Sequence, residues 1–140
     1  MPIDGLFSSR GLEVLKRGLD AFAIRGRVIS DNIANASTEG YRAKRVDFEE
    51  DLKEALERGP SLPARTDSPR HIPINSLSVG EVEPRVVESE EPAGAGEPNN
   101  VVIEREMADL AQNEILFDFA AKQVATAYST MKGAIRGTMR

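Results

Sequence analysis

The sequence predicts a mainly α-helical protein. Two long heptad helices, one at each end of the chain, should pack as an antiparallel, coiled-coil-like pair around an irregular, partly extended acidic insert. Apolar residues recur at spacings of three and four near both ends, the signature of a helix with an apolar stripe. Seven of the eight prolines lie between residues 60 and 98. We therefore expect one structural domain with three parts: an N-terminal helix and turn (1–45), the acidic insert (46–100) and a C-terminal helix (101–140).

Composition narrows the classes of function. The 140 residues include no cysteine, which excludes disulfides and thiolate metal sites. No apolar run approaches the roughly 20 residues of a membrane-spanning helix, and Met1 to Arg10 lack the pattern of a cleaved signal. The net charge is −5, and residues 46–100 hold thirteen of the acids against five Lys/Arg. Because no basic patch is concentrated anywhere, we expect no nucleic-acid partner.

The first helix is predicted over residues 11–36. Its narrow apolar stripe, here called the N-terminal seam, consists of Leu12, Leu15, Leu19, Phe22, Gly26, Ile29 and Ile33. Gly26 is the weak point, because glycine in a helix interior costs about 1 kcal/mol relative to alanine. Either the helix bends there or a partner approaches closely.

The insert has a short helix predicted within residues 46–58, ended by Gly59-Pro60. Extended pieces are expected at His71–Ile74 and Val82–Val87. Residues 88–100 are acidic, rich in Pro and Gly and almost without bulky apolar groups, so we expect a loop that is mobile in the isolated protein.

The second long helix is predicted over residues 101–136. Its stripe, the C-terminal seam, consists of Ile103, Met107, Leu110, Glu114, Phe117, Ala121, Val124, Tyr128, Met131 and Ile135. A second stripe of Leu116, Ala120, Gln123 and Ala127 widens the apolar face, so this helix needs more than one neighbour. Asn99 or Asn100 is expected to cap its start.

One charge, Glu114, interrupts the C-terminal seam. In an antiparallel pair with Ile33 opposite Met107, Glu114 lies opposite Gly26, which leaves room for a carboxylate. Arg25 and Arg27 flank Gly26 and would supply the partner that a buried carboxylate requires.

Residues 31–42 form the most informative stretch. Asn, Ser and Thr favour helix ends, and Gly40 tolerates positive φ, so the run predicts a helix end followed by a sharp turn. The order Asn32-Ile33-Ala34-Asn35, then Thr38 and Gly40-Tyr41, also resembles the signature of the bacterial flagellar rod and hook family. That family usually has proline where this chain has Glu39, which leaves the turn feasible but less rigid.

Three further passages are similar to short, proximal-rod members of that family. They are Asn99–Asn113, with an Asn-Asn-Val start; Thr66–Ile72, with an Arg-His pair; and Asp47–Glu49. The resemblance implies a structural subunit of the flagellar basal body, exported unfolded by the flagellar type III apparatus and assembled in the periplasmic rod. It implies as partners other rod subunits, copies of itself, and ring and export-gate proteins.

Other classes of function remain open. The alternatives are another rod subunit of the same family, a soluble helical adaptor or export chaperone, and a small enzyme. The sequence contains no nucleotide fingerprint and no catalytic constellation. His71 is the single histidine, and the run Glu49-Glu50-Asp51 is typical of a solvated helix face. We therefore expect no catalytic residue, metal, cofactor or small-molecule substrate.

Overall fold

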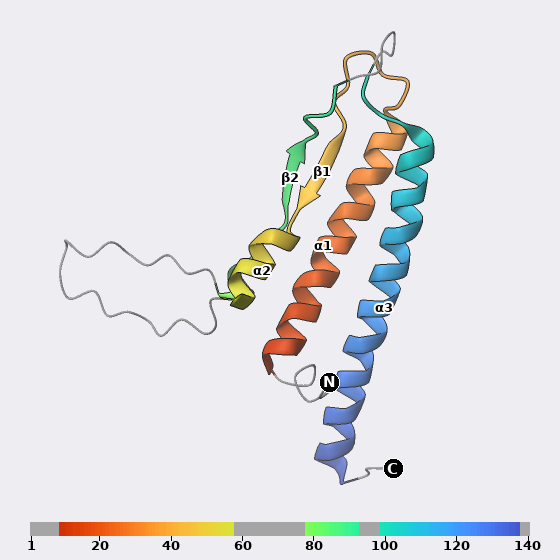
Figure 1. The fold of residues 1–140 in the computed structure, drawn as a ribbon. Coiled ribbons are helices and arrows are strands. Elements are labelled where there is room, and N and C mark those ends of the chain that lie inside the picture. The colour runs from red at the N-terminus through yellow and green to blue at the C-terminus, as the bar shows by residue number, and fades with distance from the viewer. Residues whose placement is uncertain (1–8, 58–77, 93–98, 138–140) are drawn as a thin grey trace, which may run out of the picture.

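The computed structural model describes residues 9–57, 78–92 and 99–137, which form a mainly helical structure. In chain order the elements are α1 (Ser9–Ala34), β1 (Lys44–Asp47), α2 (Glu49–Glu57), the 3-10 turn η2 (Val79–Glu81), β2 (Arg85–Glu88) and α3 (Ile103–Arg136). The helices α1 and α3 lie side by side and run in opposite directions (Figure 1). The prediction of a mainly α protein with a long helix at each end is therefore confirmed.

The insert contributes a small two-stranded sheet. Strand β1 pairs antiparallel with β2, with Lys44 opposite Glu88 and Asp47 opposite Arg85. The sheet and α2 lie on the side of α1 away from α3 (Figure 1). The short helix predicted within residues 46–58 is α2, and the piece predicted at Val82–Val87 overlaps β2. Strand β1 was not predicted, because Val46 is its single apolar residue and no alternation is visible; the piece at His71–Ile74 lies outside the described residues.

The apolar core lies between α1 and the insert rather than between the two long helices. Its buried members are Ala21, Val28, Val46, Phe48, Ala55, Val79 and Val82, with Val14, Ile24 and Leu52 packed against them. On α1 these core positions are adjacent to the N-terminal seam, not part of it. Helix α1 is thus covered on two faces, which a search for a single stripe does not reveal.

Three arginines of α1 fasten the insert to this helix. Arg10 Nη2 donates to the carbonyl oxygens of Ala55 (3.2 Å) and Leu56 (3.0 Å), and Arg17 donates to that of Gly80. Arg25 donates to Val46 O at 3.3 Å and forms an ion pair of 2.6 Å with Glu49. Two of these arginines therefore bond backbone carbonyl groups, and one pairs with an acidic side chain.

The face that α3 turns toward α1 is small and polar. Its buried residues are Asn113, Ala120 and Ala127, spaced seven apart. Ala120 and Ala127 belong to the predicted second stripe, and their small side chains let the two helices approach closely. Much of the C-terminal seam remains exposed, including Met107 (59%), Tyr128 (47%) and Ile135 (86%).

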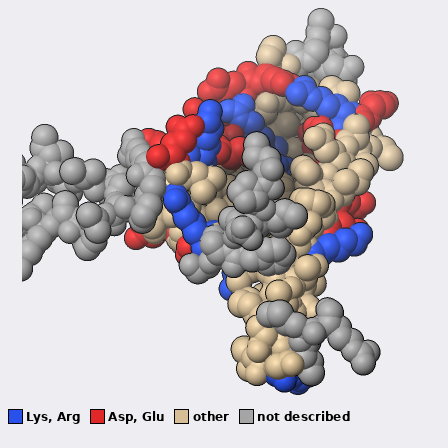
Figure 2. Space-filling view, turned by 60° about the horizontal axis from the view of Figure 1, so that its bottom comes forward, with Lys and Arg blue, Asp and Glu red and all other residues tan. Residues whose placement is uncertain are grey.

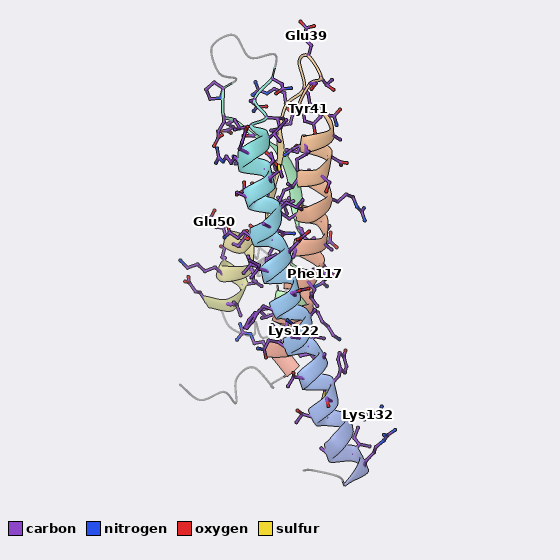
Figure 3. The ribbon with its side chains drawn as sticks, turned by 90° about the vertical axis from the view of Figure 1, so that its right-hand side faces the viewer. Glu39, Tyr41, Glu50, Phe117, Lys122 and Lys132 are labelled. Carbon is purple, nitrogen blue, oxygen red and sulfur yellow. The ribbon has the colours of Figure 1, made fainter. Side chains whose placement is uncertain are left out.

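Helix α3 is longer than α1 and projects past its beginning (Figures 1 and 3). The 34 residues of α3 span about 51 Å and the 26 of α1 about 39 Å, at about 1.5 Å per residue. The projecting end ends at Gly137, which has φ +68° and closes the last turn. No helix among the described residues is long and apolar enough to cross a membrane.

Candidate assembly site

The turn after α1 is built around the side chain of Asn32, which is 1% exposed. Its Oδ1 accepts hydrogen bonds from Lys44 N (2.9 Å) and from the Tyr41 hydroxyl (3.2 Å). Its Nδ2 donates to Lys44 O (2.8 Å) and to Glu106 Oε2 on α3 (3.1 Å). A single buried amide therefore joins α1, the start of β1 and the first turn of α3, with all four of its hydrogen-bonding positions occupied.

The rest of the signature shapes the turn itself. Asn35 Nδ2 donates back to Asp31 O (2.8 Å), and Thr38 Oγ1 lies 3.3 Å from Asn35 Oδ1. Gly40 has φ +73°, as predicted for a tight turn, and nothing lies where a Cβ would stand. Glu39 is exposed at the tip of the turn (Figure 3). Ile33 is half-buried and Ala34 is exposed.

Two asparagines that precede α3 complete the site. Asn99 is 6% exposed, and its Nδ2 donates toward the carbonyl oxygens of Ala36 (2.6 Å), Thr38 (3.1 Å) and Asn35 (3.3 Å). These oxygens lie at the end of α1, where carbonyl groups lack partners inside the helix. Asn99 therefore caps the end of α1 from a distant segment.

Asn100 fixes the neighbouring strand. Its Oδ1 accepts from Ala43 N at 2.7 Å, and its Nδ2 donates to Glu91 O at 2.9 Å. The expectation that Asn99 or Asn100 caps α3 is wrong: the cap of α3 is Val102, without a side-chain hydrogen bond. Both amides are already used by the turn. Asn32, Asn35, Asn99 and Asn100 are called the asparagine clasp below.

The prediction of a mobile loop at 88–100 therefore needs correction at both ends. Arg105 forms an ion pair with Glu91 at 2.7 Å, and Asn99 and Asn100 are held by the turn. Residues 93–98 lie outside the described residues. The composition indicated a loop, but it did not reveal that Asn99 and Asn100 in this loop form hydrogen bonds with residues 36–43.

Two ionisable groups border the clasp. Burial raises the pKa of Glu106, and the nearby Asp109 acts in the same direction, whereas the hydrogen bond from Asn32 opposes the shift. Burial also raises the pKa of Tyr41, assisted by the charges of Asp31 and Glu106. Burial beside the clasp thus favours the neutral forms of Glu106 and Tyr41, and the hydrogen bond from Asn32 offsets part of that effect for Glu106.

A second polar contact joins the long helices near their middle. Asn113 Nδ2 donates to Phe22 O at 2.9 Å, and a Cβ on Gly26 would lie 3.1 Å from the same nitrogen. Gly26 therefore permits the close approach that the sequence suggested. The approaching residue is Asn113, not Glu114, so the register differs by one residue from the predicted one.

The predicted charge contact is correspondingly wrong within the subunit. Glu114 is exposed and lies at the edge of the groove beside Gly26. Arg25 pairs with Glu49 of the insert, and Arg27 is exposed. Arg25 pairs with the insert because the insert covers the adjacent face of α1. The prediction considered only the two long helices and therefore did not include this contact.

The predicted seams have different environments in the subunit. On α1 the residues Leu12, Leu15, Leu19 and Phe22 are half-buried and Ile29 is buried. On α3 Leu110 and Val124 are half-buried, whereas Phe117 (38%) and Met131 (42%) are exposed. Sequence reasoning missed Ile115 (69%) and Phe119 (60%), which form a separate exposed pair four residues apart.

The described residues contain no cluster of His, Asp or Glu that could hold a metal ion. His71 lies outside them. What the site does instead is mechanical: it locks the end of α1, the start of β1 and the start of α3 in one arrangement. The sequence does contain a hint of the role of Asn99 and Asn100. A helix needs only one capping residue, so a pair of asparagines ahead of α3 indicates that at least one of them has another partner.

Comparison with known proteins gives this arrangement a context. The family model of flagella basal body rod proteins matches residues 12–42, which are most of α1 and the signature turn. A flagellar basal body rod protein FlgB of Escherichia coli K12 is 33% identical over 132 residues, covering 91% of this chain and 89% of that protein.

Two more relatives carry the same name. The protein of Bacillus subtilis strain 168 is 29% identical, with 94% of this chain and 97% of that protein covered. The protein of Borreliella burgdorferi is 31% identical, with coverages of 77% and 82%. The paired terminal helices, the signature turn and the family match together define a structural protein of the flagellar basal body rod. Within that class, the chain belongs to the family of the flagellar basal body rod protein FlgB.

Proposed function

We propose that this chain is a subunit of the proximal part of the rod. With other rod proteins and copies of itself, it would form the shaft that transmits torque and encloses the export channel. One structural observation supports this beyond family membership: large apolar side chains stay exposed along α3, and three of them, Tyr128, Met131 and Ile135, lie on one side of the helix. Contiguous exposed apolar surface on a small subunit marks contacts with other molecules.

The seams acquire a role in this assembly. The half-buried residues Leu12, Leu15, Leu19 and Phe22 and the buried Ile29 would hold α1 in place within the subunit. The residues Met107, Leu110, Phe117, Val124, Tyr128, Met131 and Ile135 would pack in part on neighbouring subunits. The greater exposure of the second set supports this division.

The insert would form the surface of the subunit away from α3. Acidic and basic groups lie next to one another on the face shown in Figure 2, and Glu49 of the insert pairs with Arg25 of α1. Ring and export-gate proteins would be the partners there, and export would follow the type III route without a cleaved signal. The location is then the periplasmic rod.

Two alternatives would use the same surfaces. Another rod subunit of this family would share the clasp and the exposed stripe. A soluble helical adaptor or export chaperone would also need exposed apolar stripes, but it has no evident use for the signature turn, which in this structure fixes the ends of the helices relative to each other.

The test is the purification of basal bodies from cells that express the full chain with a C-terminal epitope tag. We expect the tagged chain in the rod fraction and, by cryo-electron microscopy, at the end nearest the export gate. Recovery in the soluble fraction bound to an export substrate would favour the adaptor. Location at another level of the rod would favour a different subunit of the family.

A further inference from the structure

A groove of about 320 Å³ lies between α1 and α3 near their middle. It exists because Gly26 has no side chain there. Its apolar walls are Phe22, Leu110 and Phe117, and the carboxylates of Glu114 and Asp118 line it on the α3 side. The groove is thus apolar inside and acidic along one edge.

A buried polar atom adjoins the groove. Asn113 lines it, is 5% exposed, and uses its Nδ2 for the bond to Phe22 O. Its Oδ1 has no hydrogen-bond partner among the described residues. A buried acceptor without a donor is costly, so a ligand that brings N–H groups to this place would be stabilised.

The projecting end of α3 has the opposite character. Met131 and Ile135 are exposed at 42% and 86%, and the cations Lys132 and Arg136 are exposed beside them. Lys132 extends from the projecting part of the helix in Figure 3, and Figure 2 shows this end as largely uncharged with basic atoms at its tip. Across the described ranges, none of Glu114, Asp118, Lys132 and Arg136 has an ion-pair partner.

The acidic residues at the groove and the basic residues at the projecting end lie at matching positions along α3, separated by a fixed number of residues. Glu114 and Lys132 are 18 residues apart, as are Asp118 and Arg136, and so are Phe117 and Ile135. Eighteen residues are five turns of an α-helix, so each pair lies on the same side, separated by about 27 Å along the axis. An acidic apolar segment is therefore followed, on the same side, by a basic apolar segment.

We propose that the projecting end of α3 in one copy docks into the groove of a second copy, parallel to its α3 and shifted by about 27 Å along the axis. Lys132 and Arg136 then lie level with Glu114 and Asp118 of the neighbour, and Ile135 lies level with its Phe117. The donors of Lys132 also reach the height of Asn113. This deepens the proposed role in the rod and rests on it.

The form of the contact fits a filament. Each copy offers a groove and an end that are different surfaces, so the contact is heterologous, and the shift of about 27 Å along the axis keeps a chain of such contacts from closing into a ring. The opposite charges specify this shift, because it is the shift that places Lys132 and Arg136 of one copy level with Glu114 and Asp118 of the next. The same charges favour a second copy over an acidic partner, which the groove would repel.

The test exploits the absence of cysteine from the chain. We would replace Glu114 and Lys132 by cysteine in one full-length chain, express it in cells that lack the native copy, oxidise purified basal bodies and separate the products without reductant. The two positions in one copy lie about 27 Å apart on a single helix, far beyond the reach of a disulfide. Any bond between them must therefore join two copies. We expect a ladder of dimers, trimers and longer products.

The matched control pairs Glu114→Cys with Ala134→Cys, which lies near Lys132 on another side of the helix. We expect at most a trace of dimer from it and from the single cysteine variants. A chain that is present in basal bodies but gives no ladder would overturn the docking register and leave the rod function standing. A cross-linked product containing a different protein would overturn the second copy as occupant. Failure of the tagged native chain to enter basal bodies would count against the proposed function, whereas failure of the cysteine variant alone would not.

Charge reversal gives a second readout. Glu114→Lys combined with Asp118→Lys should reduce the swimming diameter on soft agar at least several-fold, without changing the folded fraction of the purified chain. Adding Lys132→Glu and Arg136→Glu should restore much of the diameter. Equal motility in the reversed and rescued strains would overturn the proposed charge pairing.

Discussion

At the scale of single residues, the asparagine clasp joins segments that are far apart along the chain. Asn32 and Asn99 are buried, and most of their bonds join different segments; the exception is the local bond that Asn99 Oδ1 accepts from Val101 N at 2.9 Å. Amide side chains suit this place because each offers donors and acceptors without a charge to desolvate. Removing Asn32 takes a partner from both Lys44 N and Lys44 O, and removing Asn99 takes the donor from Ala36 O.

Asn99→Ala should lower the free energy of unfolding by about 1–3 kcal/mol, because the half-buried Ala36 loses the donor to its carbonyl oxygen, whereas the carbonyl oxygens of Asn35 and Thr38 keep backbone donors. Urea unfolding followed by circular dichroism measures the change. Ser37→Ala in the same exposed turn is the control, for which a change within about 0.5 kcal/mol is expected. Equal midpoints for both variants would show that water replaces Asn99 without loss.

Glu106→Gln should stabilise the protein at neutral pH. The raised pKa of Glu106 means that the folded state binds its proton more tightly than the unfolded state does. That contribution is complete below the usual pKa of 4.5 and is lost as the pH rises through the folded value. A glutamine keeps an acceptor for Asn32 and carries no charge.

The advantage of Glu106→Gln over the native chain should therefore be largest near pH 7 and shrink toward pH 4. Urea unfolding at both pH values measures it. The exposed Glu104→Gln, two residues away, serves as the control and should show no such trend. An advantage that is independent of pH would contradict the assignment.

At the scale of elements, the pairing of α1 with α3 depends on small residues and one asparagine. Ala120 and Ala127 are buried against α1, and Gly26 accommodates Asn113. This is closer to a tight polar and small-residue contact than to the interdigitated large residues of a heptad interface. Several of the larger side chains of the C-terminal seam, among them Met107 and Ile135, therefore stay exposed in the subunit.

Gly26→Ala should destabilise the protein, since the new Cβ would lie 3.1 Å from an Asn113 nitrogen that is held by its hydrogen bond. In an Asn113→Ala background the same change should become stabilising by up to about 1 kcal/mol, the difference in helix propensity. Gly18→Ala is the matched control, because its Cβ would meet only Phe22 at 3.8 Å, an ordinary contact.

A double-mutant cycle on unfolding free energies measures this coupling. Additive effects of Gly26→Ala and Asn113→Ala would mean that the two residues do not constrain each other.

At the scale of the whole molecule, the buried apolar core lies between α1 and the insert, whereas much of the apolar surface of α3 is exposed. The core joins α1 to the insert, whereas α3 contributes few buried apolar residues and projects past its partner (Figure 1). Exposed apolar surface of this extent is typical of a face that contacts other molecules.

Ile135→Asp should leave the unfolding free energy of the purified chain within about 0.5 kcal/mol of native, because the side chain is 86% exposed. It should nevertheless abolish swimming, since assembly would bury an unpaired carboxylate. Soft-agar motility and urea unfolding measure the two effects, with Ser129→Asp as an exposed control expected to swim normally. Normal swimming of the Ile135 variant would remove this end of α3 from the assembly surface.

The sequence by itself determined the class of the fold, the two long helices, the turn at Gly40 and the family. Those features depend on local periodicity, on the φ that glycine permits and on an ordered run of residues, all of which are visible along the chain. Only the tertiary structure decided which faces meet. The insert covers a second face of α1 and takes Arg25, Asn99 caps a helix that ends some sixty residues earlier, and Asn113 replaces Glu114 at Gly26. The physical reason is that polar side chains are satisfied by whatever the fold brings near them, and periodicity carries no information about partners that are distant in sequence.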